Sequence, residues 1–177
     1  MSKNRSKIKW LIIFLLIMTV SIFVDQYTKL LAIKYLQGKE AYSLIENVLE
    51  LRFFSNTGIA WSMLEGQLFF ILFTGIVFLS VMLFFIIKLP DEKKFHSMYI
   101  LCGVLGGGAL GNMIDRIRLG YVVDFIYVSI IDFPIFNVAD MFIVVSLIIV
   151  AIYVLFVFKE DDFAFLNFKQ TKIREMK

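Results

Sequence analysis

Residues 122–140 read VVDFIYVSIIDFPIFNVAD, with three aspartates set among valine, isoleucine and phenylalanine side chains. The run that follows, 141–158, has eighteen residues and contains no Lys, Arg, Asp or Glu. A helix of about 20 such residues crosses the roughly 30 Å of hydrocarbon in a bilayer. Residues 122–140 therefore predict an acidic connection at one end of a membrane-spanning helix.

Three further segments lack charged side chains, and together they predict a membrane protein. Of the 177 residues, 60% are hydrophobic, 20 are Phe and only two are Pro, whereas soluble domains are about half apolar. The uncharged windows are 10–24, 66–87, 96–114 and 141–158. We expect an all-α membrane protein that forms a single domain over 1–177, with four transmembrane helices at about 9–33, 67–88, 96–115 and 138–158.

The first window is short, so its helix is expected to continue through DQYTKLLAI, residues 25–33. This places Asp25 and Lys29 four residues apart on one helical face, near the membrane interface. A removable secretory signal peptide is the alternative, because four basic residues precede the apolar run. No A-x-A cleavage site follows, and the later helices need no removable leader, so we favour an uncleaved anchor.

Basic residues are distributed unevenly between the two sides of the predicted membrane span. Four Lys and Arg residues precede the first helix, three lie between the second and third, and five follow the fourth, so twelve of the 18 fall on one side. Basic residues resist translocation, which assigns that side to the cytoplasm. We expect cytoplasmic tails at 1–8 and 159–177 and extracytoplasmic segments at about 34–66 and 116–137. The net charge of +3 follows from this anchoring and indicates no nucleic-acid surface.

The first external segment predicts a small β-hairpin. Residues 48–64, VLELRFFSNTGIAWSML, alternate as a strand, turn at 55–58 and resume as a second apolar strand. Phe53, Phe54 and Trp61 suit the headgroup zone, where aromatic rings are half wet, so the hairpin is expected to rest on the outer membrane surface. The alternative is that the hairpin is a structural cap that holds the helix ends together.

Glycines are concentrated in the third predicted helix. Gly103, Gly107 and Gly111 recur at intervals of four, with Gly106 and Gly108 between them. One helical face therefore lacks side chains, which lets a neighbouring helix approach closely. A glycine-rich phosphate cradle is disfavoured, because such loops follow a strand in soluble domains.

The single cysteine and the single histidine give no indication of a metal site or a thiol nucleophile. Cys102 lies inside the third predicted helix without an obvious base nearby in the sequence, and we interpret it as a small buried hydrophobe. His96 begins the same helix, and nothing adjacent supplies further ligands. We expect no bound metal.

Asp124 and Asp140 lie at the external ends of the third and fourth predicted helices. The connection between them is only long enough to fold back over the bundle, so the two carboxyl groups could face each other. Two adjacent anions repel, and the pair relaxes by sharing one proton. One carboxylate can then take a proton from water while the other carboxyl polarises a carbonyl group, which is the chemistry of aspartic peptide hydrolysis.

Spacing alone leaves ordinary structural roles open for these residues. Asn137 and Asp140 have the spacing of a capping pair at a helix start, where the helix dipole favours a carboxylate. The other acidic residues have simple structural alternatives. Asp124 could be a solvated loop residue, and Asp132 could be a turn residue before Phe133 and Pro134. At the end of the third helix, Asp115 and Arg116 could pair with each other or with lipid phosphates.

Five motifs occur in an order that resembles the lipoprotein signal peptidases, the type II signal peptidases of bacteria. They are DQYTK (25–29), NTGIAWS (56–62), GNMIDR (111–116), VVDF (122–125) and FNVAD (136–140). The resemblance spans all four predicted helices and both external segments. Trp61 departs from it, because the family usually has Phe there, but both residues are aromatic.

The resemblance implies a membrane aspartic endopeptidase that removes signal peptides from prolipoproteins, cutting before the diacylglyceryl cysteine without a cofactor. By motif, the catalytic dyad falls on Asp124 and Asp140. Positions that match those the family keeps for structure or substrate contact are Asp25, Lys29, Asn56, Gly58, Asn112, Asp115, Arg116, Asn137 and Ala139. We expect a monomer in the bacterial cytoplasmic membrane, with its active site near the outer face and with lipid-modified prolipoprotein signal peptides and membrane lipid as partners.

Two other classes of function are weighed against this one. A small proton-coupled carrier also needs intramembrane acids, but here the acids cluster at one face, and no inverted repeat or pair of interrupted helices is visible. A noncatalytic scaffold that binds lipoprotein precursors is the third class. The chain is not itself a lipoprotein, because its only cysteine lies deep in the third helix.

Overall fold

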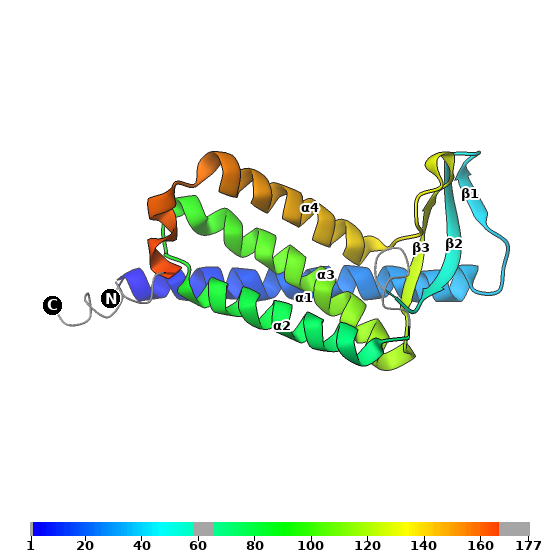
Figure 1. The fold of residues 1–177 in the computed structure, drawn as a ribbon, viewed down its shortest axis with the longest axis horizontal. Helices are drawn as coiled ribbons and strands as arrows, with labels where there is room; N and C mark the ends of the chain where they lie inside the picture. The colour runs from blue at the N-terminus through cyan, green and yellow to red at the C-terminus, as the bar shows by residue number, and fades with distance from the viewer. Residues whose placement is uncertain (1, 59–65, 167–177) are drawn as a thin grey trace.

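The computed structural model describes residues 2–58 and 66–166, and its fold is a four-helix bundle with a small sheet at one end (Figure 1). The helices are α1 (Ser2–Leu36), α2 (Leu68–Lys88), α3 (His96–Leu119) and α4 (Val138–Ile152), and α4 continues into a π-helical turn, Tyr153–Val157. Four spans are long and apolar enough to cross a membrane: Arg5–Leu36, Leu68–Lys88, Lys93–Leu119 and Val138–Val157. The predicted fold class is confirmed.

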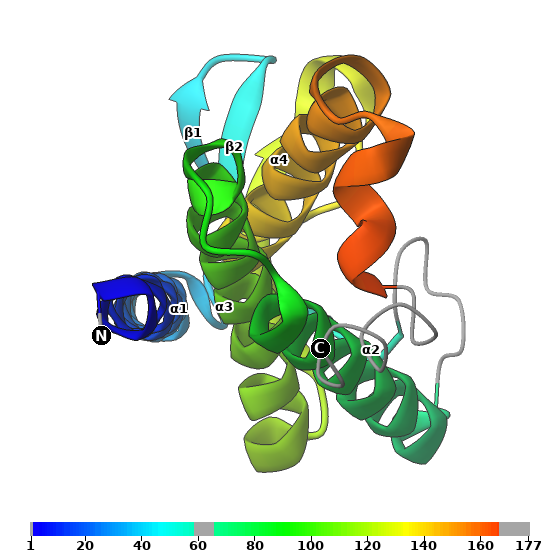
Figure 2. The same ribbon diagram turned by 90° about the vertical axis from the view of Figure 1, so that its left-hand side faces the viewer.

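Helix α3 lies at the centre of the bundle. In an apolar stretch of 18 residues taken from each helix, 56% of the α3 stretch is buried inside the protein, against 17% for α1, 17% for α2 and 6% for α4. Viewed along the bundle, α1, α2 and α4 surround α3 (Figure 2). Within the described residues α2 and α4 pack on α3 and have at most marginal contact with each other. The start of α1 and the short 3₁₀ helix Glu160–Leu166 lie at the end opposite the sheet (Figure 1).

The glycine face of α3 packs against α1, as the four-residue spacing predicts. A Cβ atom on Gly103 would come within 3.0 Å of Ile17, and one on Gly107 would lie 2.4 Å from the Cβ atom of Ser21. On the other side of α3, a Cβ atom on Gly108 would lie 2.6 Å from the backbone oxygen of Ala139 in α4. The absence of side chains therefore sets how closely both helices approach α3.

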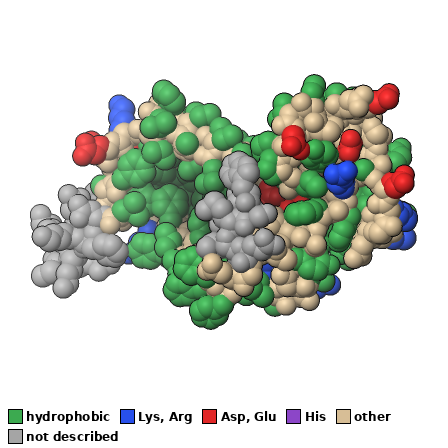
Figure 3. Space-filling model, turned by 45° about the vertical axis from the view of Figure 1, so that its right-hand side comes forward, with side chains coloured by type: hydrophobic (Ala, Val, Ile, Leu, Met, Phe, Trp, Pro, Cys, Tyr) green, Lys and Arg blue, Asp and Glu red, His purple; other side chains and the backbone are tan. Residues whose placement is uncertain are grey.

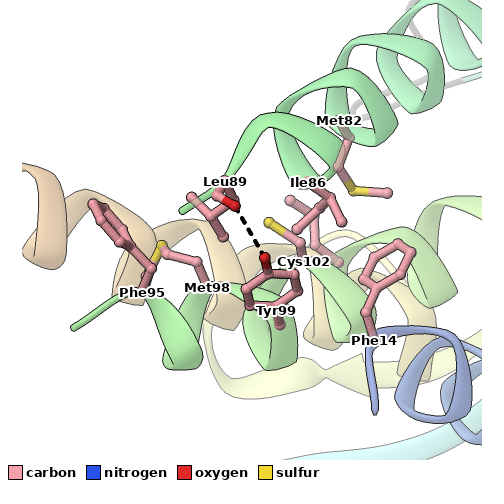
Figure 4. Close-up of a cluster of buried hydrophobic side chains, with 9 residues drawn as sticks. Phe14, Met82, Ile86, Leu89, Phe95, Met98, Tyr99 and Cys102 are labelled. Atoms are coloured by element: carbon pink, nitrogen blue, oxygen red, sulfur yellow. Dashed lines mark hydrogen bonds between the residues drawn. The ribbon is translucent and has the colours of Figure 1, made fainter. Parts of the chain in front are cut away.

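A hydrophobic core fills the bundle at the end away from the sheet (Figure 4). The Tyr99 hydroxyl donates to the backbone oxygen of Leu89 at 3.2 Å, so the buried ring has a partner for its polar end. Cys102 belongs to this core and is buried, in agreement with its interpretation as a small hydrophobe. His96 stacks on Trp10 with ring centroids 4.0 Å apart.

The sheet has three antiparallel strands in the order β1 (Tyr42–Ile45), β2 (Leu49–Asn56) and β3 (Val122–Val128). The predicted strand that begins near residue 49 is confirmed as β2, but its neighbours differ from the predicted hairpin. The hairpin partner is β1, which precedes β2, and the turn between them includes Asn47 at a positive φ of 56°. The other neighbour is β3, from the distant 116–137 connection. The predicted second strand falls mainly on residues 59–65, which lie outside the described residues, as does Trp61.

The segment before α4 folds back onto β3. The backbone N–H of Phe136 donates to Ile126 at 3.0 Å, and the N–H of Phe125 donates to the oxygen of Phe136, also at 3.0 Å. This bridge brings the start of α4 beside the middle of β3. Residues 124 and 140 thereby approach each other from a strand and a helix.

Candidate active site

Asp124 and Asp140, called the acidic pair below, line the same cavity. Asp124 lies on β3 opposite Phe54 of β2, and it is buried, with 1% of its surface exposed. Asp140 lies in the first turn of α4 and is partly buried. The sequence placed Asp124 at the end of a helix, whereas the structure places it on a strand, which fixes its backbone more firmly than a loop would.

Three asparagine side chains surround the acidic pair and donate to it. The Nδ2 atom of Asn56 lies 2.8 Å from Asp124 Oδ2, and Nδ2 of Asn137 lies 2.6 Å from Asp124 Oδ1. Nδ2 of Asn112 lies 2.8 Å from Asp140 Oδ1. These residues come from β2, the cap of α4 and α3, so three separate elements converge on the two carboxyl groups.

The orientation of each amide is set by a donor at its opposite end. The oxygen of Asn56 accepts from the N–H of Gly58 at 3.0 Å, and that of Asn137 accepts from the N–H of Asp140 at 3.0 Å. The oxygen of Asn112 accepts from the ammonium of Lys29 at 2.8 Å. Because each oxygen is occupied, each amide presents its N–H groups to the acidic pair.

Helix α4 begins with a capping box, as the spacing of Asn137 and Asp140 predicts. The Asn137 side chain accepts from the backbone of Asp140, and Asp140 Oδ2 accepts from the N–H of Asn137 at 3.1 Å. Asn137 therefore bonds to both members of the acidic pair. The capping role and a chemical role for Asp140 are compatible, because the cap uses one acceptor site of Oδ2 and each carboxylate oxygen has more than one.

The environment of Asp124 favours its neutral form. Burial raises the pKa of Asp124 to about 7, with a further contribution from the nearby Asp140, and the amide donors Asn56 and Asn137 offset this only in part. A carboxyl group with this pKa exists in both protonation states near neutral pH, as a group that exchanges a proton during a reaction must.

A buried ion network lies behind the acidic pair. The Lys29 ammonium is 2.9 Å from Asp25 Oδ2 and 2.9 Å from Asp115 Oδ2, and both side chains are almost fully buried. Asp115 thus pairs with Lys29 and not with Arg116, because consecutive residues of a helix point in different directions. Gln26, which the sequence did not single out, joins the network by donating to Asp115 at 2.9 Å.

Arg116 lines the cavity beside the acidic pair. Its Nη2 atom donates to the backbone oxygen of Gly58 at 2.7 Å, while its buried Nε atom has no partner in the described structure. Asp132 lies apart from this site, since it ends a 3₁₀ turn at a positive φ of 48° and accepts from the Tyr127 hydroxyl at 2.5 Å. The turn role predicted for Asp132 is confirmed.

The cavity has a volume of about 640 Å³ and lies between α2 and α4, with α3 at its base. Its polar end holds the acidic pair, and its walls are mainly apolar, with contributions from Ile71, Gly75, Phe78, Phe136, Ile143 and Val144. Hydrophobic side chains cover much of the helical part of the face shown in Figure 3. The cavity therefore consists of an apolar slot between α2 and α4 and a small acidic site at one end of this slot.

Among the described residues, no group of three or more His, Cys, Asp or Glu side chains is arranged to hold a metal ion. The chemistry that these residues can perform is proton transfer by paired carboxyl groups. The adjacent amides and Arg116 supply hydrogen-bond donors.

Comparisons with known proteins identify the family. Residues 17–156 match the family model described as signal peptidase (SPase) II. The chain is 44% identical over 144 residues to a lipoprotein signal peptidase of Caldanaerobacter subterraneus, covering 80% of this chain and 95% of that one. It is 36% identical over 145 residues to the lipoprotein signal peptidase of Enterococcus faecalis, covering 82% and 89%.

Two solved structures of bacterial membrane enzymes share the fold. The chain is similar to a bacterial membrane enzyme structure determined by the in meso method at 2.3 Å, with a TM-score of 0.73 and 33% identity over 80% of this chain and 87% of that one. A second such structure, at 1.9 Å, gives a TM-score of 0.72 and 32% identity over 82% and 94%. The chain therefore belongs to the signal peptidase II family and is a multi-pass membrane protease of the lipoprotein signal peptidase class.

Proposed function

We propose that this enzyme removes the signal peptide of lipid-modified prolipoproteins by cutting before the diacylglyceryl cysteine, with Asp124 and Asp140 as its catalytic dyad. The observation that carries the proposal is the position of Asn137, which bonds to Asp124 at 2.6 Å and, through its backbone N–H, to Asp140 at 3.1 Å. One residue thus holds both carboxyl groups at the polar end of one cavity.

The dyad divides the work of peptide hydrolysis between an acid and a base. The ionised carboxylate takes a proton from water, and the oxygen of that water attacks the scissile carbonyl carbon. The protonated carboxyl group donates to the carbonyl oxygen, and a proton then reaches the departing nitrogen as the C–N bond breaks. The raised pKa of Asp124 supports Asp124 as the carboxyl group that holds the shared proton in the resting enzyme.

The apolar part of the cavity suits the membrane-bound portions of the substrate. A signal peptide in the bilayer and the acyl chains on its cysteine can approach from the side, because α2 and α4 flank the cavity and, within the described residues, have at most marginal contact with each other. Arg116 lines the cavity, and its guanidinium group would donate to a backbone oxygen of a bound substrate. Binding of the apolar portions expels water, which strengthens the electrostatics of the dyad.

The excess of basic residues at the ends of the chain and between α2 and α3 supports cytoplasmic termini. The sheet and the dyad, at the opposite end of the bundle (Figure 1), then lie at the outer face. The scissile bond of a translocated precursor lies at this level beside its lipid anchor, so the substrate need not leave the membrane.

Purified enzyme in detergent, mixed with a diacylglyceryl-modified precursor, is expected to release a shorter product that a gel resolves. The same precursor with an unmodified cysteine should be cut far more slowly, because it lacks the acyl chains that fill the apolar slot. A carrier or a scaffold would leave both precursors intact. Equal cleavage of the two precursors would contradict the lipid-dependent part of the proposal.

The cleavage rate is expected to have a bell-shaped dependence on pH. As the pH rises through about 7, Asp124 loses its proton, and the pair becomes two anions without an acid. At low pH both carboxyl groups are protonated, and no base remains. Values of kcat/KM, obtained from initial rates at subsaturating precursor between pH 4 and about 9, should decline on the alkaline side with an apparent pKa near 7. A rate that keeps rising above pH 8 would contradict acid catalysis by Asp124.

A further inference from the structure

Lys29 has a buried ammonium group whose three protons all have acceptors. Only 2% of its side chain is exposed, and its Nζ atom lies 2.9 Å from Asp25, 2.9 Å from Asp115 and 2.8 Å from the oxygen of Asn112. Removing such charges from water is costly, and a buried ion network is weak evidence for stability by itself. The contacts of the network point instead toward the dyad.

The first connection runs through Asn112. An ammonium group can only donate, so Lys29 requires the oxygen of Asn112 to face it, and the amide NH₂ then faces Asp140 at 2.8 Å. Nδ2 of Asn137 adds a longer bond to the same oxygen at 3.1 Å. Without the ammonium, the Asn112 oxygen loses the shorter of its two bonds and its only charged donor, so the amide can rotate and turn an oxygen toward the carboxylate of Asp140.

The second connection runs through the two acids that Lys29 holds. Asp25 Oδ1 accepts from the backbone N–H of Ala139 at 3.1 Å, directly before Asp140. Asp115 Oδ2 accepts from the backbone N–H of Val123 at 3.1 Å, directly before Asp124. Each acid therefore fixes the chain segment that carries one member of the dyad, and Lys29 joins the two acids.

We propose that Lys29 is a positioning residue for the dyad, which orients Asn112 toward Asp140 and ties together the segments that carry Asp124 and Asp140. This proposal rests on the dyad of the proposed function. Lys29 lines no part of the cavity, so it acts through other residues and does not touch the substrate.

Lys29→Met removes the charge and nearly preserves the length of the side chain. It is expected to lower kcat for the lipid-modified precursor by about 100-fold, the loss that misplacement of catalytic groups by about 1 Å can cause. KM should change by less than about 3-fold, because the cavity walls are untouched. Lys34→Met is the matched control, because Lys34 lies on the same helix and is exposed, and it should leave kcat unchanged.

A double-mutant cycle tests the route through Asn112. If Lys29 acts by orienting that amide, Lys29→Met combined with Asn112→Ala should lower kcat little more than the worse single variant does. If the losses in kcat of the two single variants multiply in the double variant, this route is wrong. Full activity of Lys29→Met would also overturn it. Should Lys29→Met fail to fold in detergent, Lys29→Gln serves for the same cycle, and failure of both to fold would assign Lys29 to folding and overturn the proposal.

The pH profile supplies a readout that a purely structural role would not move. Asp124 is faced by Asp140 from α4, by Arg116 from α3 and by Lys29 from α1, and the positive charge of Lys29 favours ionised Asp124. Its removal should shift the alkaline limb of the profile to higher pH. An unmoved limb would contradict the proposal. Full activity of Asp124→Asn would instead overturn the dyad itself, so the two failures are distinguishable.

Discussion

Asp124→Asn and Asp140→Asn are each expected to lower kcat by about 10⁴-fold, the upper range for loss of a general acid or base. An amide can neither take a proton from water nor return one to the departing nitrogen. The fold should persist, because the amide oxygen at 140 can still accept from the N–H of Asn137, and burial at 124 costs less for a neutral group than for an anion. Single-turnover cleavage of the lipid-modified precursor measures the loss.

Asp132→Asn is the matched control for these two variants. Asp132 lies in the same connection, is exposed, and bonds to Tyr127 and not to the dyad. It should retain the cleavage rate of the parent enzyme, while all three variants bind the precursor with similar affinity. If Asp124→Asn or Asp140→Asn cleaves the precursor at more than about a tenth of the parental rate, that residue is not a member of the catalytic dyad.

Gly107→Ala is expected to lower the free energy of unfolding by about 2 kcal/mol. The added Cβ atom would lie 2.4 Å from Ser21 and 2.9 Å from the backbone oxygen of Met18, so α1 and α3 must move apart. Overpacking costs up to about 3 kcal/mol, and the higher helix propensity of alanine returns about 1 kcal/mol. Denaturant unfolding in detergent measures the difference.

Gly75→Ala is the comparison for the glycine variant. A Cβ atom on Gly75 would lie 2.9 Å from the sulfur of Met113, which is near the end of a flexible side chain and can move aside. Its free energy of unfolding should change by less than about 1 kcal/mol. Equal losses for the two variants would show that close approach of α1 to α3 is not what the glycine face provides.

The sequence predicted the helices well because the bilayer imposes a simple rule on them. A membrane span needs about 20 apolar residues, and four windows satisfied that rule. The sheet was harder to predict. β1 has only four residues, all exposed, and β3 is an apolar run within the predicted 116–137 external segment, for which no strand was predicted. Pairing of β2 with β3 joins segments about 70 residues apart, and no local pattern encodes such a contact.

The site shows the same division between local and distant contacts. The capping box of Asn137 and Asp140 follows from a spacing of three, and the Asp25–Lys29 ion pair follows from a spacing of four. The ion pair of Lys29 with Asp115 does not follow from any sequence spacing, because the two residues lie on different helices. The roles of Gln26 and of the backbone N–H at residues 123 and 139 also depend on tertiary packing, which single-sequence patterns do not contain.

Both α2 and α4 pack on α3, and among the described residues they have at most marginal contact with each other, so direct packing between them contributes little to the width of the slot. Because α2 faces mainly away from the protein, it can move toward or away from α4 around a bound substrate while the close contact of α4 with α3 at Gly108 stays intact. The slot can thus adapt through α2 to apolar segments of different size, while the acidic pair stays fixed on β3 and on the start of α4, which packs closely on α3.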